Sequence, residues 1–226
     1  MVALAGVGIL LMIAGFFSFA HAAAWQNSET LFLSVLESYP NSLTARNNLG
    51  MEYLYRNQND KALAEFNTLL GQHTWPITLV NRGLLYFREG KISEAIADYQ
   101  KAIERDPLYY DAYYELGNIA YQAGDLPKAA TLFTKAYELN PQYTNALNNL
   151  GGAYMRMHEW KKAIDTLKKL LAQNPVFTEG YYNLAVAYEQ TGRFNDAAQM
   201  YQSALDLNPD DPDALSGLAR ARNHQR

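Results

Sequence analysis

The chain has no cysteine among its 226 residues, and it has only four histidines. No disulfide, thiolate metal ligand or cysteine nucleophile can therefore exist, although this absence does not fix the cellular compartment. The histidines are His21, His73, His158 and His224, and none has a second ligand beside it at helical spacing. We therefore expect no metal site.

The chain also lacks an excess of positive charge. It has 19 basic and 23 acidic residues, for a net charge of −4, and no basic face forms that could hold a phosphate backbone. Nucleic acid is therefore not an expected partner. The sequence has neither a glycine-rich phosphate loop nor a nucleophile elbow, so we expect no enzymatic activity and no cofactor.

The first 28 residues contain no charged side chain. The apolar run from Val2 to Ala24 would span roughly 34 Å as a helix, which is enough to cross a bilayer. We favour a membrane-anchor helix over residues 1–24. A cleaved signal peptide is an alternative, since Ala20-His21-Ala22 has the small-x-small form, but a basic n-region is missing. A buried helix of an incomplete extra repeat is the third alternative.

The charges beyond this apolar run bear on its orientation. No lysine or arginine occurs before Arg46. The positive-inside rule therefore gives no reason to hold the rest of the chain in the cytoplasm. We expect a membrane-anchored protein whose folded part lies outside the cytoplasm.

A period of 34 residues dominates the rest of the chain. Four columns of similar residues keep this spacing: Gly83, Gly117, Gly151 and Ala185; Ala95, Ala129, Ala163 and Ala197; Tyr99, Phe133, Leu167 and Tyr201; Pro107, Pro141, Pro175 and Pro209. Such a period indicates stacked copies of one supersecondary unit, each of which buries its apolar face against its neighbours. Stacks of this kind form a long groove that holds other proteins.

Each period contains two helical patterns. In residues 110–143, apolar residues follow helical spacing on both sides of Gly124-Asp125, and Asn140-Pro141 ends the second pattern. The turn between the two patterns carries Gly90, Gly124, Gly192, Asn57 or His158. A left-handed backbone explains this set, so we interpret His158 as a turn residue rather than a ligand.

Three features depart from the repeat pattern or constrain it: Gly117, the length of the first unit, and Arg82. Gly117 predicts a close approach of the two helices, with Ala129 opposite it. The first unit, residues 43–75, has 33 residues and no closing Asn-Pro, so we expect its second helix to end in a distorted way. Arg82 stands where the other units have leucine, and it is either a surface side chain or a charge in the groove.

These patterns resemble the tetratricopeptide repeat. The resemblance is carried by LGNIAYQAGDLPKAATLFTKAYELNP (116–141), by residues 148–175 and by residues 183–209. It implies an all-α, right-handed solenoid. The units are residues 43–75, 76–109, 110–143, 144–177 and 178–211, with a half-repeat helix at 25–42 and a capping helix or half-repeat at 212–226.

The resemblance implies that the first helix of each unit lines a concave groove. The position before the Leu-Gly pair would face inward, and it holds Asn48, Asn81, Glu115, Asn149 and Asn183. An amide donates and accepts hydrogen bonds at once, so these asparagines suit the main chain of an extended peptide. The alternative is that they bond neighbouring helices.

Aromatic and cationic residues flank these asparagines on the same helices. They are Tyr55, Phe87, Arg88, Tyr114, Tyr121, Arg156 and Tyr182. Tyrosine and arginine are typical anchors of binding surfaces, so we predict that they line the groove. The lysines by which chaperone-binding relatives hold a carboxylate are missing, so an acidic chaperone tail is a poor candidate ligand.

The two ends of the chain suggest alternatives to a scaffold. Residues 25–41 align with the second half of a unit, and residues 212–224 with the first half. The ends could cap the stack, or they could join head to tail into a filament through Trp25, Phe32, Leu215 and Leu218.

Residues 25–50 also resemble the junction after the last membrane helix of polytopic glycosyltransferases that carry tetratricopeptide repeats. No catalytic acidic motif of those enzymes is present. We therefore weigh three functions: a membrane-tethered scaffold for protein segments, a self-assembling filament subunit, and the non-catalytic tail of a glycosyltransferase-like system.

Overall fold

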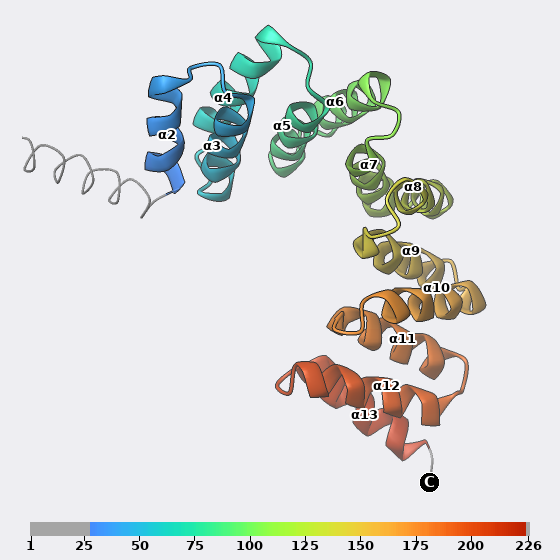
Figure 1. Ribbon diagram of the computed structural model, residues 1–226. Coiled ribbons are helices and arrows are strands. Elements are labelled where there is room, and N and C mark those ends of the chain that lie inside the picture. The colour runs from blue at the N-terminus through green and yellow to red at the C-terminus, as the bar shows by residue number, and fades with distance from the viewer. Residues whose placement is uncertain (1–27, 225–226) are drawn as a thin grey trace, which may run out of the picture. The chain divides into compact units, whose positions relative to one another are not determined.

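The computed structural model describes residues 28–224, so the expected anchor at residues 1–24 and Trp25 lie outside the described part. None of the helices that it describes is long and apolar enough to cross a membrane. The described residues form twelve α-helices and no strand (Figure 1). These helices are α2 (Ser28–Ser38), α3 (Leu43–Tyr55), α4 (Asn59–Gln72), α5 (Pro76–Arg88), α6 (Ile92–Arg105), α7 (Tyr110–Gln122), α8 (Leu126–Leu139), α9 (Thr144–Arg156), α10 (Trp160–Gln173), α11 (Thr178–Gln190), α12 (Phe194–Leu207) and α13 (Pro212–Asn223).

From α3 to α12 the helices alternate regularly in length. The first helix of each pair has 13 residues. The second helix has 14 residues. The turn inside each pair holds one residue with positive φ: Asn57 (56°), Gly90 (75°), Gly124 (81°), His158 (58°) or Gly192 (72°). The interpretation of His158 as a left-handed turn residue is confirmed.

The chain divides into two compact units after Arg105. The first contains α2–α6 and the second contains α7–α13. Within each unit the first helices of successive pairs contact one another, as α3 and α5 do, and as α9 and α11 do. The described second helices make no such contact with each other. The first helices therefore form the inner face of each unit's curve.

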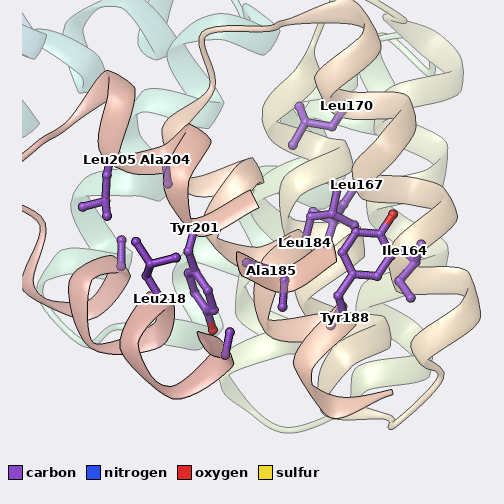
Figure 2. Packing of buried hydrophobic residues seen from close by; sticks show 14 of the residues in the cluster. Ile164, Leu167, Leu170, Leu184, Ala185, Tyr188, Tyr201, Ala204, Leu205 and Leu218 are labelled. Atoms are coloured by element: carbon purple, nitrogen blue, oxygen red, sulfur yellow. The ribbon is translucent and has the colours of Figure 1, made fainter. Parts of the chain in front are cut away.

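The core of the second unit runs through successive helix pairs. Figure 2 shows Leu167 of α10, Leu184 of α11 and Tyr201 of α12 packed in one buried cluster. The corresponding cluster of the first unit contains Leu49, Phe66 and Leu85, which are fully buried. Because each cluster draws on more than one helix pair, no pair could bury its apolar face alone.

Gly117 lies against a large side chain, as the predicted close helix approach requires. A Cβ atom there would come within 2.7 Å of the Phe133 ring. The expected neighbour, Ala129, is buried but is not the closest residue. Phe133, one turn further along α8, supplies the three atoms nearest to that Cβ position, and the placement of Ala129 opposite Gly117 stays a prediction.

Arg82 is neither a surface side chain nor a groove charge. Its Nε and Nη2 donate to the two carboxylate oxygens of Asp98, each at 2.7 Å, and its Nη1 donates to Asn67. Asp98 is only 5% exposed. The hydrogen bond to Asp98 raises the pKa of Arg82, even though burial acts against it. The arginine therefore links α5 to α6 inside one helix pair.

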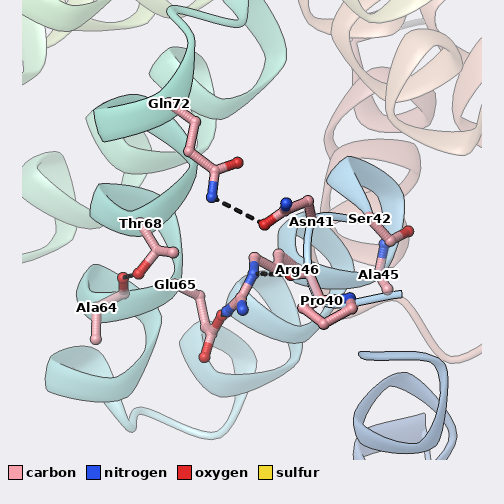
Figure 3. A network of polar contacts seen from close by, with 9 residues as sticks. All are labelled: Pro40, Asn41, Ser42, Ala45, Arg46, Ala64, Glu65, Thr68 and Gln72. Atoms are coloured by element: carbon pink, nitrogen blue, oxygen red, sulfur yellow. Dashed lines mark hydrogen bonds and ion pairs between the residues drawn. The ribbon is translucent and has the colours of Figure 1, made fainter. Parts of the chain in front are cut away.

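The first helix pair does not end in a distorted helix, contrary to expectation. Helix α4 has the full 14 residues, and the shorter repeat is absorbed by the loop before Pro76, where His73 packs on Trp75 at 4.7 Å. Polar contacts hold this pair to the preceding loop (Figure 3). Arg46 donates to the Pro40 carbonyl at 2.8 Å and pairs with Glu65 at 2.7 Å.

Candidate binding site on the inner face

A pocket of about 260 Å³ opens on the inner face of the second unit, between α7, α9 and α11. It is lined by Tyr121, Asn148, Asn149, Gly152, Met155, Arg156 and Asn183. Four of these, Tyr121, Asn149, Arg156 and Asn183, were predicted as groove residues. The structure brings them together from three helices. Asn148, Gly152 and Met155 were not predicted as site residues.

The asparagines of the pocket tie neighbouring first helices together. Asn149 Nδ2 donates to Asn118 Oδ1 at 2.9 Å and to the Tyr114 hydroxyl at 3.0 Å. Asn183 Nδ2 donates to Asn148 Oδ1 at 2.9 Å. The Nδ2 groups of Asn149 and Asn183 are thus directed at the preceding first helix, as the alternative interpretation held.

Each amide also keeps one unused end. Within residues 28–224, Asn149 Oδ1, Asn183 Oδ1 and Asn148 Nδ2 make no hydrogen bond with another side chain or main-chain group. Two acceptors and one donor therefore line the pocket. A peptide main chain offers the complementary donors and acceptors at every residue.

Arg156 supplies the single charge of the pocket. Its guanidinium carbon lies 4.6 Å from the centroid of the Tyr121 ring, which is a cation–π contact. Its Nη1 donates to the Tyr121 carbonyl at 2.8 Å, near the end of α7, and this carbonyl also accepts from the Gly124 main-chain N–H at 3.2 Å. No carboxylate among the described residues forms an ion pair with it.

Gly152 opens the pocket. The other repeats have Met51, Leu84, Asn118 and Val186 at this position. A Cβ at Gly152 would meet only the Tyr121 hydroxyl, at 3.5 Å, which is ordinary contact, whereas a Cβ at Gly151 would come within 2.8 Å of Leu167. Helix packing therefore requires Gly151 but not Gly152.

In the first unit the acceptor of the amide bond is Asn47, one residue before the predicted Asn48. Asn48 is exposed, while Asn47 is 4% exposed and accepts hydrogen bonds from Asn81 Nδ2 at 3.0 Å and from Thr78 at 3.4 Å. Asn48 is therefore not part of the described amide network. The column donors Asn149 and Asn183 each bond a preceding first helix, whereas in the described part of the chain α3 follows only α2.

Two other predicted residues of the first unit form a looser copy of the Arg156 arrangement. Arg88 lies 5.8 Å from the centroid of the Tyr55 ring and donates to the Leu54 carbonyl at 3.4 Å. Tyr55 is 65% exposed, and Phe87, which precedes Arg88, is half-buried. The interactions of Arg88 are longer than those of Arg156, so Arg88 is held less firmly.

Tyr114 and Tyr182 do not line the Arg156 pocket. Tyr114 packs edge-on against Tyr143 at 4.9 Å, and Tyr182 packs edge-on against Tyr201 at 5.8 Å. Tyr182 lines a separate pocket of about 530 Å³, together with Phe177, Asp211 and six other residues of α11, α13 and the loops before them. These two ring contacts lie within single repeats, 110–143 for Tyr114 and 178–211 for Tyr182.

Glu115 is the one acidic residue in the amide column. It accepts a hydrogen bond from Asn118 Nδ2 at 3.1 Å. Burial raises the pKa of its carboxyl group, the Asn118 hydrogen bond partly opposes this, and the negative charge of Asp111 adds to it. Burial also raises the pKa of Asp111.

The candidates for self-assembly mostly pack within their own chain. Phe32 is partly buried against the core cluster of the first unit. Leu218 is 7% exposed and belongs to the core cluster of the second unit, whereas Leu215 is 50% exposed. Of the four candidates, only Leu215 presents a largely exposed apolar side chain in the described part of the chain.

Family models of the tetratricopeptide repeat match residues 80–144, 120–188 and 178–211. Together they span more than half of the chain, which therefore belongs to the tetratricopeptide repeat family. Proteins of this family generally mediate protein–protein interactions and are typically non-catalytic. A search of curated protein sequences found no match.

Solved structures show the same fold. The crystal structure of MamA is 26% identical, with a TM-score of 0.63 over 71% of this chain and 95% of that one. A thermophilic tetratricopeptide repeat protein from Thermus thermophilus, TTC0263, is 25% identical, with a TM-score of 0.60 over 80% and 98%. YrrB, described as having an unusual peptide-binding site, is 22% identical, with a TM-score of 0.62 over 82% and 96%. The resemblance to a glycosyltransferase junction stays a prediction.

Proposed function

We propose that this protein is a non-catalytic scaffold that binds an extended protein segment along the inner face of its repeats. The pocket formed by α7, α9 and α11 is the proposed site in the second unit. Its volume of about 260 Å³ suits one side chain and the adjoining main chain. Small-molecule sites are usually larger, at about 300–1,000 Å³.

The observation that carries this proposal is Gly152. Glycine inside a helix costs about 1 kcal/mol relative to alanine, because it loses more backbone freedom on folding. At Gly151 the contact with Leu167 explains this cost, but a Cβ at Gly152 would fit. Helix packing does not explain the glycine at position 152, whereas a requirement for open space on the inner face does.

The experiment introduces into the pocket the residue that the first repeat has there. Gly152→Met copies Met51 and fills the pocket without disturbing the contact between α9 and α10. Gly71→Met is the matched control, because Gly71 lies on α4 and a Cβ there meets nothing within 4 Å. Both variants lose a helix glycine at a position that accepts a Cβ, so each should unfold at or slightly above the wild-type temperature.

The readout is capture of partners from a membrane extract by the full chain. A partner held by the wild type and by Gly71→Met, but lost with Gly152→Met, supports the inner-face pocket. Equal capture by all three proteins places the binding surface elsewhere.

We further propose that residues 2–24 tether the protein to a membrane, with the repeats outside the cytoplasm. The uncharged stretch and the absence of flanking lysine and arginine support this. Deleting residues 2–24 should release the protein from carbonate-washed membranes, and external protease should digest the repeats in sealed cells. Resistance to protease in those cells would place the repeats in the cytoplasm.

A further inference from the structure

We propose that the Arg156 pocket selects an aspartate or glutamate side chain within the bound segment. This inference rests on the proposed function and adds the chemistry of the partner. The starting observation is that Arg156 is the only charged residue lining the pocket. A carboxylate placed there would meet a cation that has no acidic partner in residues 28–224.

Two carboxylates of α11 and of the turn after α9 have other partners. Glu189 of α11 pairs with Arg220 at 3.0 Å and accepts a hydrogen bond from the Tyr201 hydroxyl at 2.7 Å. Glu159, which precedes α10, pairs with Lys162. Neither of these acids pairs with Arg156, which is exposed and whose guanidinium stays accessible to a carboxylate of a ligand.

Two contacts within the protein orient the exposed Arg156 side chain. One of its five N–H groups is used on the Tyr121 carbonyl, and the ring of Tyr121 holds the flat guanidinium from one side. The remaining donors keep the fork geometry that matches a carboxylate with two parallel hydrogen bonds. A side chain that is already held loses less conformational entropy on binding.

The amide groups of the pocket can bind the main chain of the same segment. Asn149 Oδ1 and Asn183 Oδ1 can accept from peptide N–H groups, and Asn148 Nδ2 can donate to a peptide carbonyl. These three residues line the same pocket as Arg156. An extended segment with an acidic residue thus finds partners for its side chain and for its backbone, whereas a basic residue there meets a like charge.

The test uses the full chain in detergent and a library of random short peptides displayed inside a carrier protein, so that no free terminus competes for Arg156. Selection is run on the wild type, on Arg156→Gln and on Arg88→Gln. Glutamine is the natural residue at this position in two other repeats, as Gln122 and Gln190, so the fold should tolerate it. Arg88→Gln is the matched control, because it removes the equivalent arginine outside the pocket.

We expect the wild type and Arg88→Gln to enrich peptides with one fixed acidic position, and Arg156→Gln to lose that preference. For a selected peptide, changing the acid to its amide should weaken binding to the wild type about tenfold, as expected for a charge-assisted pair. The same change should leave binding to Arg156→Gln unaltered. A higher salt concentration should weaken the binding of the acidic peptide and leave the binding of its amide variant unchanged.

Two results would overturn the inference, and they are distinguishable. If the wild type enriches peptides without an acidic position, and Arg156→Gln enriches the same ones, the inner face binds peptides but Arg156 does not select acids. If the wild type enriches no peptide at all, the proposed function fails together with the inference.

Discussion

The guanidinium of Arg82 donates to both carboxylate oxygens of Asp98, at 2.7 Å each, across the interface between α5 and α6. The third repeat has Leu116 and Leu132 at the two equivalent positions. The second repeat thus has a charged pair where the third has an apolar pair.

Arg82→Leu alone should destabilise the protein by about 3 kcal/mol, because it leaves the nearly buried Asp98 without its cation. The double variant Arg82→Leu, Asp98→Leu should recover most of this loss, since it recreates the apolar pair of the third repeat. Urea denaturation of the two variants and the wild type measures both effects. A double variant no more stable than the single one would show that α5 and α6 need the ion pair itself.

Replacing each of the two adjacent glycines of α9 by alanine should change the stability of the protein in opposite directions. Gly152→Ala should stabilise the protein by about 0.5–1 kcal/mol, because the helix gains from losing a glycine and the added methyl group fits. Gly151→Ala should destabilise it by about 1–3 kcal/mol, because the methyl group pushes against Leu167. Thermal unfolding followed by circular dichroism compares them. Equal shifts of the two midpoints would contradict the packing difference.

Replacing asparagines on the inner face should affect stability as well as binding. Asn149→Ala removes the donor to both Asn118 and Tyr114, so we expect a loss of about 1–2 kcal/mol. Denaturant unfolding tests this, with exposed Asn48→Ala as the control that should change little. If Asn149→Ala is as stable as the wild type, the bonds to the preceding helix contribute nothing.

The raised pKa of Glu115 predicts how stability depends on pH. Burial disfavours the charged carboxylate in the folded state, so the folded protein binds its proton more tightly than the unfolded chain does. This contribution to stability is full below the ordinary pKa of 4.5 and is lost as pH rises through the higher folded value.

Glu115→Gln should therefore be more stable than the wild type at neutral pH, and the difference should shrink in acid. Glutamine can still accept the hydrogen bond from Asn118. Unfolding midpoints across the acidic to neutral range check this. A difference that grows on acidification would mean that the charged form is the favoured one in the folded protein.

Much of the fold could be predicted from the sequence because it depends on small and conformationally special residues. Gly117 and its column mark close helix contacts, and the left-handed turn at His158 followed from its position among glycines. The ion pair of Arg82 was missed because Asp98, on the following helix, was not compared with its own column. The two columns do not change together, since the first repeat has Leu49 with Glu65 at these positions, so the pairing becomes evident only in the structure.

The candidate site was predicted only in part, for a related reason. Tyr121, Asn149, Arg156 and Asn183 have side chains that suggest binding, and the structure places them around one pocket. Gly152 contributes by having no side chain, and its role appears only when the space around it is known. Whether a given amide faces the preceding helix or the pocket also depends on side-chain rotamers, which a column of asparagines does not specify.

The amide bonds of the inner face also restrict which repeat can follow which. Asn81, Asn149 and Asn183 each donate to a side-chain oxygen one residue before the equivalent position of the preceding repeat, on Asn47, Tyr114 and Asn148. In the third repeat the asparagine position holds Glu115, whose carboxylate has no donor. The residue that would accept its hydrogen bond, in the second repeat, is Val80, whose side chain has no acceptor. Duplicating the repeat at 144–177 would preserve this matching, whereas placing it directly after 76–109 would leave a donor facing valine. These hydrogen bonds therefore constrain the order of the repeats. Arrays with rearranged repeats should fold only where each asparagine Nδ2 faces a side-chain oxygen of the preceding repeat.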